Sequence, residues 1–173
     1  MNVQMDIIIP PIILGVLILM IFAINAFILE SSVDNRLQNE MQIHANMAVD
    51  VIQEEIRGLE VLLEEPDNSV VFRTFRGDSV AIERMDSDLR VIRRYGHMAT
   101  TVIDTTVHAL YLKDLQFSPQ PAGVNWSLAH FITVSVRTES RSDDHVSFNE
   151  DQKVVGALSE KQIFFRNKVA SVP

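Results

Sequence analysis

The sequence predicts an α+β fold, in which a long N-terminal helix, first transmembrane and then amphipathic, packs on a C-terminal antiparallel β-sheet head. Three observations predict it. Residues 7–29 contain no ionisable side chain. Residues 31–63 contain no proline, and their apolar residues recur every three or four positions, as on one face of a helix. From residue 70 onward, short runs alternate apolar and polar residues as strands do.

The uncharged segment, residues 7–29, is long enough to cross a bilayer. As a helix it measures about 35 Å, whereas the hydrocarbon core of a bilayer is about 30 Å thick. A cleaved secretory signal would have a basic residue before the apolar run and small residues at a cleavage site after it, and residues 1–6 and 26–30 provide neither. We therefore expect a membrane anchor rather than a signal or a buried core helix. Because only one such segment exists, a polytopic channel or transporter is excluded.

The second segment, residues 30–63, is predicted to continue the helix as an amphipathic stalk that lays an apolar stripe on its own head. An ordinary juxtamembrane coiled coil is the alternative, because the stripe also fits loose heptads. The residues of the stripe are Val33, Leu37, Met41, Ala45, Ala48, Val51 or Ile52, Ile56, Leu59, and Leu62 or Leu63.

The head is predicted to comprise residues 64–173, because Pro66 and the turn-forming residues after it end the helix. Expected strands lie at residues 70–75, 79–85, 89–95, 100–103, 107–117, 131–138 and 161–168. Residues 118–123 are expected to form a loop, and the polar, acid-rich residues 140–159 a flexible one.

Composition argues against several functions. The net charge is −8, and Arg90, Arg93 and Arg94 form the nearest approach to a basic patch, so we expect no nucleic-acid binding. The absence of cysteine excludes disulfides, thiol catalysis and cysteine-based metal sites.

Catalytic and metal-binding patterns are also missing, so we expect no enzymatic activity, no cofactor and no metal. The five histidines, at positions 44, 97, 108, 130 and 145, lack metal-ligand spacing, and no nucleophile elbow or phosphate-binding glycine loop occurs. Asp143, Asp144, Glu150 and Asp151 remain a calcium alternative, without the spacing of a calcium loop. Trp126 is either a core residue or an exposed contact.

The order of these features resembles the type IV pilin and pseudopilin superfamily, and within it minor pilins of the PilW-like kind and J-type pseudopilins. The resemblance rests on the apolar helix of residues 7–29, its amphipathic continuation at 37–57 and the hairpin at 79–94. The segments at 102–117, 131–137 and 163–167 add to it. It covers most of the chain as architecture rather than as an invariant motif.

The resemblance implies a filament subunit that assembles through its apolar helix. A processed prepilin has a Gly before the cleavage point and a Glu a few residues inside the apolar run. This chain has neither; Gln4, Met5 and Asp6 form the corresponding region. A mature start at Met5 or Asp6 would indicate processing, and a start at Met1 a plain anchor.

The side chains expected to contact neighbouring helices are Ile12, Gly15, Val16, Leu19, Ala23 and Asn25. Small residues such as Gly15 and Ala23 allow close packing of helices. Asn25, the only strongly polar residue of the run, either hydrogen-bonds between helices or caps toward the membrane interface.

The expected function is therefore that of a minor pilin or pseudopilin-like subunit of a type IV pilus or type II secretion-like filament. Its expected partners are other pilin or pseudopilin subunits, an inner-membrane assembly platform and membrane lipid. The expected location is the inner membrane, crossed once, with a periplasmic or extracellular head that joins a filament or filament tip after assembly. The alternative is a single-pass inner-membrane protein whose periplasmic head is a binding module in an envelope complex.

Overall fold

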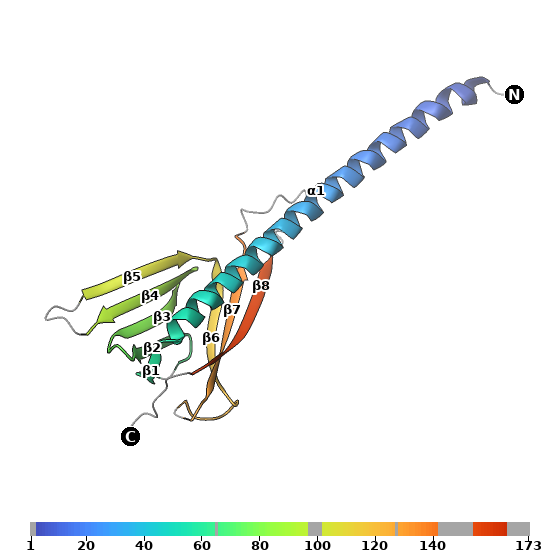
Figure 1. The fold of residues 1–173 in the computed structure, drawn as a ribbon. Coiled ribbons are helices and arrows are strands. Elements are labelled where there is room, and N and C mark those ends of the chain that lie inside the picture. The colour runs from blue at the N-terminus through green and yellow to red at the C-terminus, as the bar shows by residue number, and fades with distance from the viewer. Residues whose placement is uncertain (1–2, 65, 97–101, 127, 142–153, 166–173) are drawn as a thin grey trace.

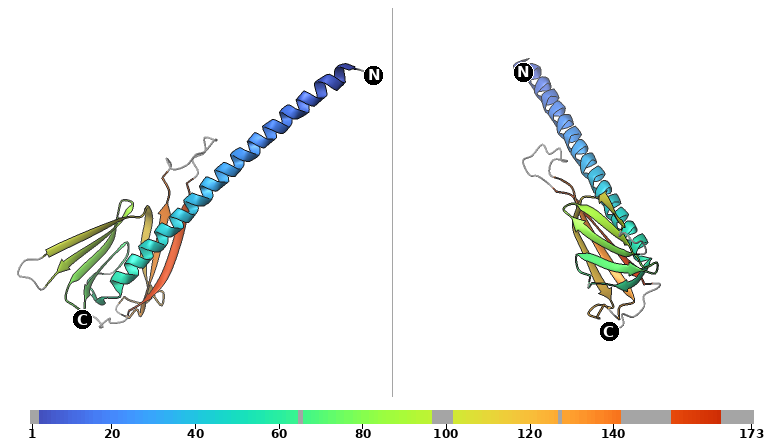
Figure 2. Two further views of the ribbon diagram at one scale, coloured as in Figure 1. Left: turned by 45° about the horizontal axis from the view of Figure 1, so that its top comes forward. Right: turned by 90° about the vertical axis from the view of Figure 1, so that its left-hand side faces the viewer.

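The computed structural model describes residues 3–64, 66–96, 102–126, 128–141 and 154–165, with the backbone alone for residues 3–9. It has an α+β fold in which one long N-terminal helix packs on antiparallel sheets (Figure 1). Helix α1, Val3–Ile56, has 54 residues and is about 80 Å long. Pro10 and Pro11 lie near its start, within the helix. The first half of α1 extends away from the head, and the second half lies against it (Figures 1 and 2).

The first sheet of the head has five strands in sequential order, and every neighbouring pair is antiparallel. Its strands are β1 (Leu59–Leu62), β2 (Ser69–Thr74), β3 (Ser79–Met85), β4 (Asp88–Tyr95) and β5 (Val102–Ala109). Such a meander follows from short connections such as the one at Asp86, which has a φ of 55°. The edge strands are β1, which is short, and β5.

The second sheet has three antiparallel strands in the order β6-β7-β8. They are β6 (Leu112–Gln120), β7 (Phe131–Glu139) and β8 (Gly156–Phe164). The second half of α1 lies along β7 and β8 (Figure 1). Polar contacts follow this boundary: the Thr138 hydroxyl donates to the Met41 carbonyl, the Ser159 hydroxyl to Asn46 Oδ1, and Lys161 Nζ to Asp50 Oδ1.

One apolar core joins the helix and the two sheets. The end of α1 contributes the buried residues Ala48, Val49, Ile52 and Ile56. Alternate residues of both sheets face them, as the period of two requires. These sheet residues include Val70, Phe72, Val80, Ile82, Leu89, Val91, Leu115, Phe117, Ile132, Val134, Val136 and Ile163. The helix therefore contributes to the core of the head.

The predicted helix end at residue 63 is wrong. The helix ends at Ile56, and Leu59–Leu62 forms β1, which pairs with β2. The apolar residues of this segment fit either a helical or an extended pattern. Pairing with the edge of β2 supplies hydrogen-bond partners for its backbone when it is extended. Gly58, a poor helix former, lies at the change, and its carbonyl accepts a hydrogen bond from the Phe75 amide.

Other predicted boundaries of the head also differ. The strands expected at 100–103 and 107–117 are instead β5 and β6, joined by a short connection at Leu110 and Tyr111, where Tyr111 has a φ of 52°. No glycine or proline marks this connection. Strand β6 continues through Pro119 into the expected loop. Strand β8 begins at Gly156, inside the segment expected to be flexible, and ends before the predicted end at 168; residues 142–153 of that segment lie outside the described residues.

Candidate functional sites

The first candidate site is the protruding half of α1. Its large apolar side chains between Ile12 and Leu29 are 46% to 71% exposed. Among the described residues, α1 is the one helix long and apolar enough to cross a membrane, with a mean hydropathy of 3.0 in its most apolar window and none of that window buried. The helix is therefore compatible with a single-pass membrane topology, as expected.

The predicted contact residues of the anchor divide between two faces of α1. Ile12, Val16, Leu19 and Ala23 follow one another at intervals of four, three and four residues, so they share a face. Further steps of three and four residues lead from Ala23 to Leu37 and Met41, which the head buries.

Gly15 lies beside this face, and nothing lies within 4 Å of a Cβ added to it. Asn25 lies on the opposite face. Residues Gln4, Met5 and Asp6 have a helical backbone, and their side chains lie outside the described part of the chain.

Two apolar residues on the outward face of the stalk were not predicted as contacts from the sequence. Ile43 and Met47 lie one helical turn apart and are 58% and 51% exposed, although the opposite face of the helix at this level is buried by the head. Glu40, one turn before Ile43, is also exposed. We call Glu40, Ile43 and Met47 the stalk patch. The stalk patch was predictable from the sequence, because two apolar residues lie four positions apart on an otherwise polar face of the helix.

A second exposed apolar surface lies on the outer face of the five-stranded sheet. Strand β5 pairs with β4 and reaches beyond the core, so seven of its eight residues are exposed. Ile103 and Val107, which are 59% and 54% exposed, lie opposite Arg94 and Arg90 of β4 and so share their face. Arg73 and Arg94 lie in the same cross-strand row, each opposite Ser79.

We call this surface the head patch; it consists of Arg73, Ile92, Arg94, Ile103 and Val107. Within the described residues, Arg73 and Arg94 have no ion-pair partner. Two unpaired guanidinium groups next to exposed β-branched side chains are unexpected on a chain with a net charge of −8.

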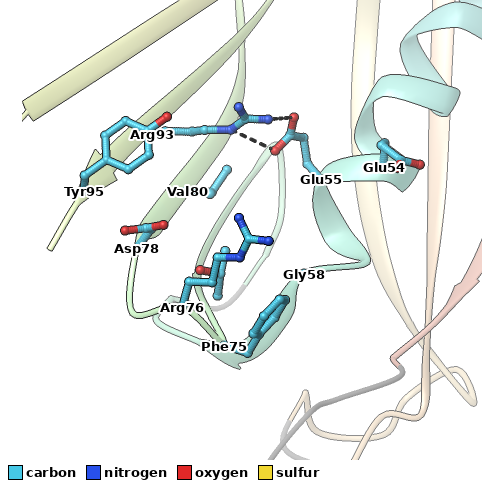
Figure 3. A pocket seen from close by; sticks show the side chains of 10 residues that line it. Glu54, Glu55, Gly58, Phe75, Arg76, Asp78, Val80, Arg93 and Tyr95 are labelled. Carbon is cyan, nitrogen blue, oxygen red and sulfur yellow. Dashed lines mark hydrogen bonds and ion pairs between the residues drawn. The ribbon is translucent and has the colours of Figure 1, made fainter. Parts of the chain in front are cut away.

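A polar pocket of about 470 Å³ lies where the end of α1 meets the β2–β3 hairpin and the end of β4 (Figure 3). One wall is the ion pair in which Arg93 donates to both carboxylate oxygens of Glu55. The hydrogen bond to Glu55 raises the pKa of Arg93 above its ordinary value, so the guanidinium stays charged. The guanidinium carbon of Arg76 lies 5.5 Å from the centre of the Phe75 ring, and the buried hydroxyl of Thr74 has no hydrogen-bond partner.

The lining of this pocket is rich in charged groups. Glu54, Glu55, Asp78, Arg76 and Arg93 contribute charges of both signs, and no nucleophile is hydrogen-bonded to a base there. Arg76 and Asp78 flank Gly77, whose φ of 87° marks the tight turn between β2 and β3.

The remaining residues considered in the sequence divide between described and undescribed parts of the chain. Over the described residues, no group of three or more potential metal ligands comes together. His97, His145 and the four acids proposed as a calcium alternative lie outside those residues. His44 lies 5.3 Å from Tyr111, ring centre to ring centre. Trp126 is partly buried and packs against the core.

Comparison with known proteins found no matching family model, curated protein or solved structure.

Proposed function

We propose that this protein is a pilin-like structural subunit, of the minor pilin or pseudopilin kind, in a type IV pilus or type II secretion-like filament. The observation that carries the proposal is the exposed apolar half of α1, continuous with a half that is built into the head. Lipid covers such a surface before assembly, and the same helices of neighbouring subunits cover it afterwards. The head supplies no reaction in this role.

The proposal places the subunit in the inner membrane, with the head in the periplasm or outside the cell. Its partners are other pilin or pseudopilin subunits, the inner-membrane assembly platform and membrane lipid. The assembly contacts would include the face formed by Ile12, Val16, Leu19 and Ala23, with Gly15 allowing close approach. Pairing of Asn25 between helices would add a hydrogen bond in a medium without water.

The second candidate function is a single-pass envelope protein whose head binds a partner in a stable complex. The polar pocket favours it, because its volume lies in the range of ligand-binding clefts and its lining includes Glu54 and Glu55, in the last turn of α1 and so far from the anchor (Figure 3). This role requires no departure of the helix from the bilayer.

Cysteine cross-linking distinguishes the two functions, because the chain has no cysteine of its own. Full-length Val16→Cys and Ala23→Cys variants are oxidised in cells, and the sheared extracellular fraction is compared with the membrane fraction. A filament yields ladders of high oligomers from a variant carrying both cysteines. Membrane-bound dimers alone would refute the filament. Ile21→Cys, on the opposite face of the helix, is the matched control for face specificity.

The amino-terminal sequence of the mature protein gives an independent test. A start at Met5 or Asp6 supports processing as in the resembling superfamily, whereas a start at Met1 supports a plain anchor.

A further inference from the structure

We propose that the head patch of one subunit docks on the stalk patch of a second copy of this chain. The inference rests on the proposed filament and identifies which surfaces of the described residues meet outside the apolar anchor. It has three supports: the exposure of both patches, their charge and the asymmetry of the contact.

Exposure is the first support. Four apolar residues of the two patches, Ile43 and Met47 on α1 and Ile103 and Val107 on β5, are each more than half exposed, and Ile92 of the head patch is partly exposed. Neither patch lies on the anchor, so lipid does not account for them. Each patch joins two such side chains on one face of a regular element, so these are not apolar residues scattered singly over the surface.

Charge is the second support and selects the occupant. Arg73 and Arg94 of the head patch lack an ion-pair partner among the described residues, and so does Glu40 of the stalk patch. Farther along α1, Asp50 and Glu54 are already paired with Lys161 and Arg57. Contact between the patches would give Glu40 an arginine partner while the apolar side chains bury one another.

The third support is the kind of assembly that such a contact gives. The two patches lie on different elements, α1 and the β4–β5 edge, so the contact is heterologous. A pair of copies joined in this way keeps one free patch of each kind, one on each copy, and the contact repeats along an open chain unless a rotation closes it. An open chain is what a filament subunit requires.

The test mixes two full-length single-cysteine variants, Ile43→Cys and Ile103→Cys, which carry tags of different size. Because the natural chain lacks cysteine, cross-links form only at the two chosen positions. The expected product is the mixed dimer, and a variant with both cysteines gives a ladder. Mixing Ile43→Cys with Leu158→Cys is the matched control, because Leu158 on the outer face of β8 is 58% exposed, close to the 59% of Ile103.

Charge reversal tests the pairing without relying on cysteine geometry. We expect Arg94→Glu in the Ile103→Cys chain to lower the mixed-dimer yield roughly tenfold, and Glu40→Arg in the Ile43→Cys chain to restore it. Both side chains are exposed, so the fold is retained, and the thermal unfolding curve of each variant verifies this.

Every outcome decides the inference. If only Ile43–Ile43 dimers form, stalks pair with stalks. If only Ile103–Ile103 dimers form, two β5 edges pair with each other. Either result overturns the proposed contact, and so does an absence of cross-links. Ladders through Val16 and Ala23 without the mixed dimer would leave the filament standing and remove this contact. The mixed dimer without those ladders would keep the contact and remove the filament.

Discussion

The hydroxyl of Thr138 donates a hydrogen bond to the backbone carbonyl of Met41 at 2.9 Å, although 97 residues separate them in sequence. Thr138 is fully buried in the middle strand of the three-stranded sheet, and Met41 lies in the buried face of the helix. A polar side chain is thus used inside the apolar contact between α1 and β7. This hydrogen bond sets which residue of the helix lies opposite Thr138 of the sheet.

Replacing Thr138 by Val removes this hydrogen bond while conserving the shape of the side chain. We expect the free energy of unfolding to fall by about 1 kcal/mol, the usual net contribution of one hydrogen bond. Urea unfolding of the full chain in detergent measures the change. Thr138→Ser, which keeps the hydroxyl, should lose less, and an unchanged stability of the Val variant would contradict the importance of the contact.

Ile52 and Ile43 provide a matched pair on one helix, because the first is fully buried and the second exposed. Ile52→Ala leaves a cavity in the core and should lower the free energy of unfolding by about 2–5 kcal/mol. Ile43→Ala should change it by at most about 0.5 kcal/mol. The same unfolding assay compares them, and equal losses would mean that the stalk does not pack as described.

The ion pair between Arg93 and Glu55 joins β4 to the end of α1. The Arg93 side chain is 42% exposed and that of Glu55 15%, so solvent weakens the interaction. We expect Arg93→Ala to lower the free energy of unfolding by about 1–2 kcal/mol, and Arg93→Lys to recover only part because it lacks the bidentate geometry.

The pH dependence of this contribution follows from the raised pKa of Arg93. A raised pKa in the folded protein gives stability that is complete below the unfolded value and lost only as pH rises through the folded one. Both lie in the strongly alkaline range for arginine. The difference between the natural chain and Arg93→Ala should therefore stay constant between about pH 6 and about pH 9; a decline over that interval would argue against this assignment.

Gly96, after β4, should not tolerate a side chain. A Cβ added there would lie 2.9 Å from the backbone carbonyl oxygen of Gly77, and backbone cannot move away as a flexible side chain can. Gly96→Ala should cost about 1–3 kcal/mol of stability in the unfolding assay. Gly15→Ala is its control, because nothing lies within 4 Å of the new Cβ and alanine favours a helix. Equal effects of the two changes would refute the close contact.

The fold class and the long helix were predictable because each depends on local pattern. An uncharged run followed by an apolar stripe predicts one continuous helix, and alternating runs predict strands. The pattern failed at Leu59–Leu62, where the same residues fit a helix or a strand and the free edge of β2 decides. It also failed at Tyr111, because a positive φ in a residue other than glycine has no local marker.

The candidate surfaces were predictable only in part. The apolar anchor is evident from its composition. The anchor has one face that continues into the buried face of the stalk and one face opposite to it. This division could not be predicted, because it depends on which side of α1 the sheets cover. The stalk patch and the head patch are defined by what the core does not bury, and strand pairing brings Arg73 and Arg94 into one row across Ser79. Such pairing depends on register, which composition does not determine.

The three polar contacts between α1 and the three-stranded sheet, at Met41, Asn46 and Asp50, follow one another along the helix. A tensile force applied to the anchor acts along the helix, and β8 runs beside the helix (Figure 1). The contacts are therefore loaded in shear and share the force, rather than breaking one after another from an end. Sliding the helix out would also displace the buried side chains of its apolar stripe together. The head should thus transmit mechanical tension from the anchor to its β-strands before it unfolds.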